Sequence, residues 1–166
     1  MDGARLDFLL AQVIEQARSL SIPVSRRIHP HVVLNTRART RFGCCRRAEG
    51  RFVIEVAAAL LEAEESALCR VLAHEVLHTC PGCANHGPRW KHWARLMSLH
   101  FGYDIHRTDS HGQLGLEDSR PVRYLVVCDS CGCRIPRMKR SPLVDHPERY
   151  RCRCGGRLSV IVPGQA

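Results

Sequence analysis

The amino-acid sequence predicts an α+β fold, in which helices cover a small antiparallel sheet and a small cysteine-rich β module follows. Residues 1–105 alternate helix-period and strand-like hydrophobic segments, whereas the last part of the chain carries two closely spaced cysteine pairs. A chain of 166 residues has room for one modest core and one small appendage. We therefore expect a core over residues 1–105, a linker over 106–122 and the cysteine module over 123–166.

The expected core begins with a helix over residues 7–20, where leucine, valine and isoleucine recur at helical spacing. Three short strand-like segments follow, at residues 31–35, 40–46 and 51–56. Ala48-Glu49-Gly50 predicts a hairpin turn between the last two segments.

A second helix is expected over residues 62–79, because acidic residues precede its hydrophobic stretch and Pro81 and Gly82 end it. Nearly all of its faces are hydrophobic, so we expect it to be buried. The turn reverses the chain, and a third helix is expected over residues 89–101. The two helices should therefore converge near the turn.

The second expected helix carries His74-Glu75-Val76-Leu77-His78, the HExxH pattern of zinc hydrolases. At about 100° per residue, the two imidazoles lie about 40° apart on one helix face, so both can bind one ion. Glu75 lies beside them as the candidate catalytic base. His86 is the candidate third ligand, since catalytic zinc commonly takes three protein ligands. The alternative is that these histidines are ordinary surface or core residues.

Four cysteines in the last part of the chain are spaced for a structural zinc ion, namely Cys128, Cys131, Cys152 and Cys154. Twenty residues separate the two pairs, as in a zinc ribbon. The second pair is Cys-x-Cys rather than Cys-x-x-Cys, and Cys133 or His146 could substitute for one ligand. A module this small needs the metal in order to fold.

Ten cysteines without an N-terminal leader segment fit metal ligation in a reducing compartment better than disulfides. Buried or idle thiols are expected at Cys44, Cys45, Cys80 and Cys83, with a redox pair or an auxiliary metal site at the last two as the alternative. No hydrophobic stretch reaches 18 residues, so we expect a cytoplasmic protein without membrane contact. We also expect a monomer.

The net charge of +9 indicates a polyanionic partner. From residue 121 onward the chain has nine Lys and Arg but three Asp and Glu, so +6 of this charge lies in the cysteine module. Closely spaced cations with a neighbouring aromatic residue suit phosphate contacts and base stacking on single-stranded DNA. The candidate DNA-binding residues are Arg134, Arg137, Lys139, Arg140, Arg149, Tyr150 and Arg151. A solvated basic surface is the alternative.

The sequence resembles the SprT-like family of zinc metalloproteases. The matching segments are residues 41–43, 52–56, 74–79 and 85–91. The resemblance implies a zincin-like core of the minimal gluzincin type, with a catalytic zinc ion in addition to the structural one. It also implies that the zinc ligands are His74, His78 and His86 and that Glu75 is the catalytic base.

Spartan-like members of this family cleave proteins on DNA, including proteins covalently crosslinked to it. The resemblance therefore implies protein substrates, a DNA partner and a role in DNA–protein crosslink repair. In zincin-like folds an edge strand can pair with the substrate main chain, and residues 51–56 are the candidate because they precede the metal-binding helix. The alternative is that these residues form an ordinary strand of the sheet. Two other functions remain open: a zinc-stabilised nucleic-acid-binding or regulatory protein with little or no proteolytic turnover, and zinc-dependent hydrolysis of a small amide.

Overall fold

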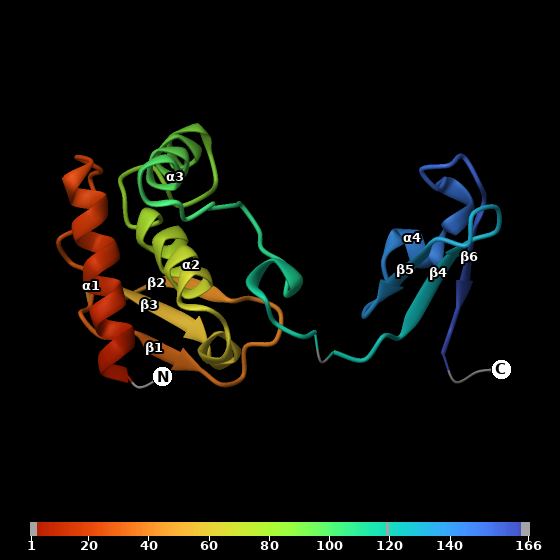
Figure 1. The fold of residues 1–166 in the computed structure, drawn as a ribbon, viewed down its shortest axis with the longest axis horizontal. Coiled ribbons are helices and arrows are strands. Elements are labelled where there is room, and N and C mark those ends of the chain that lie inside the picture. The colour runs from red at the N-terminus through yellow and green to blue at the C-terminus, as the bar shows by residue number, and fades with distance from the viewer. Residues whose placement is uncertain (1–2, 119, 164–166) are drawn as a thin grey trace. The chain divides into compact units, whose positions relative to one another are not determined.

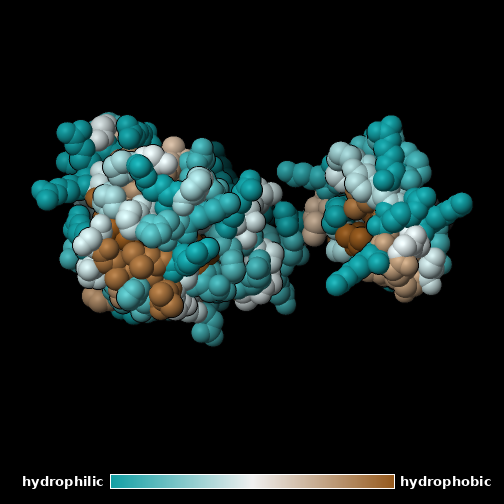
Figure 2. Space-filling view, turned by 90° about the horizontal axis from the view of Figure 1, so that it is seen from above, coloured by the Kyte–Doolittle hydropathy of each residue, from teal (hydrophilic) through white to brown (hydrophobic). Residues whose placement is uncertain are grey.

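The computed structural model describes residues 3–118 and 120–163. These residues form two compact units, of which the first runs to Asp118 and the second follows it (Figure 1). Both units combine helices with a small sheet, so the predicted α+β class is confirmed. In the view of Figure 2, hydrophilic side chains cover most of the surface of each unit. None of the helices in the described part of the chain is long and apolar enough to span a membrane.

The first unit contains three α-helices, a three-stranded sheet and two short 3₁₀ helices. In chain order these elements are α1 (Gly3–Ser19), β1 (Val33–Asn35), β2 (Gly43–Ala48), β3 (Arg51–Ala57), η1 (Ala58–Glu62), α2 (Glu65–Leu77), α3 (Pro88–Phe101) and η2 (Gly112–Leu114). The helices lie close to their predicted positions because local signals mark their ends. Pro88 occupies the first turn of α3, and Gly102 ends that helix with a φ of 69°.

The sheet of the first unit has the order β1-β3-β2, with β3 in the centre. The predicted hairpin joins β2 and β3 in antiparallel register, but β1 pairs with β3 in parallel. The prediction of a purely antiparallel sheet was therefore wrong, and so was the choice of residues 51–56 as an edge strand. A long connection between β1 and β2 allows β1 to add to the free side of β3, and strand order of this kind is not encoded locally.

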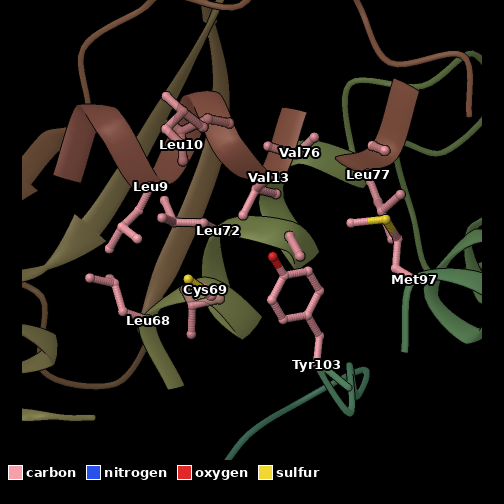
Figure 3. Packing of buried hydrophobic residues seen from close by; sticks show 14 of the residues in the cluster. Leu9, Leu10, Val13, Leu68, Cys69, Leu72, Val76, Leu77, Met97 and Tyr103 are labelled. Carbon is pink, nitrogen blue, oxygen red and sulfur yellow. The ribbon is translucent and has the colours of Figure 1, made fainter. Parts of the chain in front are cut away.

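The core of the first unit lies between α1, α2 and the inner face of the sheet. Leu9, Leu10 and Val13 of α1 face residues of α2 such as Leu68 and Leu72 (Figure 3). Burial of α2 on nearly all sides agrees with its hydrophobic sequence. The helix that carries the HExxH pattern is thus packed on nearly all sides, which fixes the direction of its functional side chains.

Residues 106–118, predicted as part of a linker, belong instead to the first unit. Leu114 and Leu116 are 1% and 9% exposed and pack into the same core as α1 and α2. The guanidinium of Arg70 on α2 donates to the backbone carbonyls of Tyr103 (3.0 Å) and Gln113 (3.3 Å). The sequence of this segment has no hydrophobic period, so isolated anchors of this kind could not be recognised from it.

The second unit is a three-stranded antiparallel sheet of order β5-β4-β6 with two short helical turns. Its elements are β4 (Tyr124–Cys128), β5 (Arg134–Arg137), α4 (Pro142–Asp145), η3 (Pro147–Arg149) and β6 (Leu158–Ile161). The buried cluster of this unit consists of Val126, Cys128, Val144 and Leu158. Apolar burial on this scale stabilises a fold only weakly, so the two cysteine turns at the end of the sheet become important.

Candidate metal centre

Three imidazoles converge where α2 ends and the chain turns back toward α3. The Nε2 atom of His78 lies 3.2 Å from the Nε2 atoms of both His74 and His86, and the latter two are 2.9 Å apart. His74 and His78 lie one helical turn apart, and the turn at Pro81 and Gly82 returns His86 to the same point. Gly82 has a φ of 73°, a conformation that suits glycine and closes this turn.

Backbone carbonyls orient two of the three rings. The Nδ1 atom of His74 lies 2.9 Å from the carbonyl oxygen of His106, and that of His78 lies 2.7 Å from the carbonyl oxygen of Cys83. When Nδ1 carries the proton and donates to these carbonyls, the lone pair of each Nε2 faces the point of convergence. The structure therefore brings together the three predicted ligands and supplies partners that hold two of them in place.

The protonation state of the rings also suits a metal ion. Burial, together with the nearby His78, lowers the pKa of His74 to about 4. Burial and His78 likewise lower the pKa of His86. Neutral imidazoles are the form that binds zinc, and nitrogens bound tetrahedrally at about 2.0–2.1 Å lie about 3.3 Å apart. The observed separations of 2.9–3.2 Å are close to this value, so the three side chains fit a zinc ion.

Trp90, on the first turns of α3, forms one wall of this centre. Its ring centroid lies 4.7 Å from that of His74, 5.6 Å from that of His78 and 4.5 Å from that of His86. The indole is only 2% exposed, so it shields the imidazoles from water and restricts their rotation. Trp90 follows His86 by four residues, a spacing that could have indicated this contact.

The side chain of Glu75 extends from α2 toward β2 and lies beside the imidazoles. The side chain is buried, and burial raises the pKa of its carboxyl to about 7. The backbone amide of Cys45 on β2 donates a hydrogen bond to the carboxylate and opposes part of this shift. A group with a pKa near neutrality can both accept and release a proton, which is the property required of a general base.

A groove of about 570 Å³ passes over the centre, and its lining includes Glu75 and all three imidazoles. One wall consists of residues 43–47 on β2. Because β2 is an edge strand, one of its sides has no neighbouring strand in the sheet. A smaller hollow of about 180 Å³ continues beyond Gly43 and Glu75 and is bordered by Arg41 and by residues 107–109.

The second candidate site is the group of four thiols in the second unit. The Sγ atoms of Cys128 and Cys154 lie 3.6 Å apart, and so do those of Cys131 and Cys152. Thiolates bound tetrahedrally to zinc at about 2.3 Å lie about 3.8 Å apart, so this group also fits zinc. The pKa of the Cys128 thiol is lowered to about 6, mainly because the backbone amide of Cys131 hydrogen-bonds to it.

The substitutes considered from the sequence lie outside this group of thiols. Cys133 is exposed, and the ring of His146 lies 3.4 Å from a carboxylate oxygen of Glu148. Gly156 closes the site tightly, since a Cβ there would lie 2.7 Å from the Sγ of Cys128. The preferred set of four cysteines is therefore the one that the structure brings together.

The other four predicted thiols take part in neither group, namely Cys44, Cys45, Cys80 and Cys83. Burial raises the pKa of the Cys45 and Cys80 thiols to about 12 and also raises those of Cys44 and Cys83. Thiols of this kind stay protonated, which makes them poor metal ligands and poor nucleophiles. The carbonyl of Cys83 nevertheless orients His78, a role that no side-chain pattern reveals.

The predicted DNA-binding residues lie on β5 and after it, and around η3. All are exposed except Arg137, which is half-buried. Arg140 forms an ion pair with Asp145 at 2.8 Å, so part of its charge is compensated. Arg134 and Lys139 have no acidic partner among the described residues. These positions are accessible, and their role stays a prediction.

The HExxH helix, the returning third histidine and the buried carboxylate define a metallopeptidase-like centre. A model of the SprT-like family matches residues 11–111, which is more than half of the chain. The chain belongs to the SprT-like family, whose members are generally metalloprotease-like. The match covers all of the centre in the first unit and ends before the cysteine group. No curated protein matches the chain.

Proposed function

We propose that the chain is a zinc-dependent metalloendopeptidase with a zincin-like core that cleaves proteins bound or crosslinked to DNA. The observation that supports this proposal best is the convergence of three imidazoles beside a buried carboxylate, within a groove bordered by an edge strand. A purely structural metal site would not need Glu75 in this position.

When bound, zinc lowers the pKa of a water molecule and polarises the scissile carbonyl. Glu75 accepts the proton of the attacking water and delivers it to the leaving amine, and its pKa near 7 suits both transfers. His106 and Cys83 hold two ligand rings through their carbonyls, and Trp90 excludes water from one side. The residues of the chain thus orient the metal ligands, exclude water from one side of the centre and accept the proton of the attacking water.

The free edge of β2 is the candidate binding strand for substrate. A peptide laid along Gly43–Ala48 would pair through its main chain and pass directly over Glu75. Main-chain pairing places few demands on sequence, which suits a protease that acts on many different DNA-bound proteins. The cysteine group and its basic neighbours would bind DNA with single-stranded character and restrict cleavage to proteins held there.

The test is cleavage of a loosely folded DNA-bound protein by the zinc-loaded chain, with and without DNA. We expect DNA-stimulated cleavage by the wild type and a loss of at least about 100-fold in Glu75→Gln, with zinc content and fold retained. Glu62→Gln, an exposed change just before the same helix, is the matched control and should cleave normally. Full activity of Glu75→Gln would refute the role of Glu75 as the general base. DNA and zinc binding without any cleavage would favour the regulatory alternative.

A further inference from the structure

The charge of the first unit is strongly segregated along its sequence. Residues 26–51 contain eight arginines, no lysine and a single acidic residue, Glu49, which gives a net charge of +7. The other residues before 121 carry eight basic and twelve acidic side chains, a net charge of −4. All eight arginines are exposed, so this charge faces solvent. The basic character of the chain is therefore not confined to the cysteine module.

Five of these arginines gather at one end of the first sheet. Phe52 at the start of β3 donates from its backbone amide to the carbonyl of Arg27 at 2.8 Å, so Arg26 and Arg27 flank this strand. On the other side of β3, Arg47 of β2 pairs in register with Phe52. Neighbouring strands lie about 4.8 Å apart, which brings these backbones within about 10 Å of one another. We call Arg26, Arg27, Arg46, Arg47 and Arg51, with Phe52, the arginine surface.

Acidic partners neutralise little of the arginine surface. Glu55 forms ion pairs with both Arg46 and Arg41, so one carboxylate is shared between two guanidinium groups. None of the ion pairs among the described residues involves Arg26, Arg27 or Arg51. These three guanidinium groups thus remain available to an external anion, whereas Arg5, Arg18 and Arg70 of the same unit each have an acidic partner.

The arginine surface has features that suit nucleic acid in particular. The guanidinium of Arg47 lies 4.7 Å from the ring centroid of Phe52, a cation–aromatic pair of the kind that stacks on bases. Arginine binds phosphate oxygens through its planar fork, and the segment uses arginine at all eight basic positions. Arg37, Arg39 and Arg41 lie between β1 and β2 and extend the charge toward the other end of β3, a strand of about 20 Å.

We propose that the arginine surface binds the phosphate backbone of nucleic acid, which gives the first unit its own nucleic-acid contact in addition to that of the cysteine module. Arg46 and Arg47 also line the groove over His74 and Glu75, so a strand bound here borders the entrance to the candidate active site. A protein attached to that strand would be held beside the groove. Only this last use rests on the proposed function; the binding itself does not.

The test measures DNA affinity of the full chain against salt, in the Glu75→Gln background so that cleavage cannot interfere. The triple change Arg26→Gln, Arg27→Gln, Arg51→Gln removes three charges without touching the groove. Each lost phosphate contact should lower the slope of log affinity against log salt by about 0.9, so we expect a decrease of about 2–3 and at least about ten-fold weaker binding at low salt. Duplex and single-stranded DNA are measured separately to show which one the surface prefers.

The matched control removes the same net charge from other exposed positions of the first unit, through Arg18→Gln, Lys91→Gln and Arg95→Gln. It should leave the salt slope within about 0.5 of the parent, since only local contacts release counterions. Both triple variants are also made with Arg149→Gln and Arg151→Gln, so that the cysteine module cannot mask the effect. Equal slopes for the two triple variants would overturn the proposal. So would lost binding of polyglutamate with unchanged DNA binding, which would identify a surface for acidic polypeptides.

Discussion

Glu75 shows how much of this centre depends on the close packing of single residues. The carboxylate lies between α2 and β2 because the strand has no side chain at Gly43. A Cβ at position 43 would lie 2.5 Å from Oε1 of Glu75 and 2.8 Å from a methyl group of Val71. Neither neighbour can retreat easily, since Val71 belongs to the core. Gly43 is therefore required for the position of the Glu75 carboxylate, rather than for backbone freedom.

Gly43→Ala should displace Glu75 while leaving the imidazoles in place. We expect normal zinc content and a fall in cleavage of about 100-fold, because a misplacement of about 1 Å can cost this much. Kinetics under saturating substrate, with metal analysis of the same samples, measure both quantities. Gly112→Ala is the control, since a Cβ there meets no atom within 4 Å. Equal activity of the two variants would show that Glu75 tolerates the extra methyl group.

At the level of elements, the sequence predicted what local signals encode. The HExxH spacing placed two imidazoles on one face of α2, and Pro81 and Gly82 predicted the turn that returns His86. Strand order depends instead on pairing between distant segments, which is why β3 was mistaken for an edge strand. The partners of the imidazoles escaped prediction for a different reason. They are backbone carbonyls of His106 and Cys83, and every residue carries a carbonyl.

The segment after α3 is the element whose role was least visible in the sequence. Arg70 on α2, one turn before His74, donates to the carbonyls of Tyr103 and Gln113 and lies 3.5 Å from a carboxylate oxygen of Asp109. These contacts anchor the stretch that carries the His106 carbonyl. Arg70 is therefore a positioning residue, which acts on the metal centre through a loop rather than by contact.

Arg70→Gln should weaken zinc binding without unfolding the first unit. Loss of partners that orient metal ligands typically lowers metal affinity by about 10–100-fold, and we expect a change at the lower end. Competition with a chromophoric chelator gives the affinity, and the absorption spectrum of the cobalt-substituted protein reports ligand geometry. Glu117→Gln, an exposed change in the same segment, should alter neither quantity. Wild-type affinity in Arg70→Gln would mean that the loop holds its position without this anchor.

At the scale of the whole molecule, the two units differ in the size of their buried cores. The buried cluster of the first unit contains 26 residues, most of them from its three α-helices and β3, whereas that of the second contains four. A fold with so few buried side chains needs a cross-link, and the four thiols provide one when they share a zinc ion. Under the proposed function, the first unit would need zinc for chemistry and the second would need it for structure.

Removal of zinc should therefore affect the two units differently. With a strong chelator, we expect amides of β4, β5 and β6 to lose protection from hydrogen exchange while those of α1 and α2 keep theirs. Cys131→Ser should reproduce the loss in the second unit and reduce bound zinc from two ions to about one per chain, with the site in the first unit still filled. Retained protection in β4–β6 without metal would contradict a structural role for this site. Exchange that rises equally in both units would instead show one cooperative fold, in which the cysteine group stabilises the candidate active site.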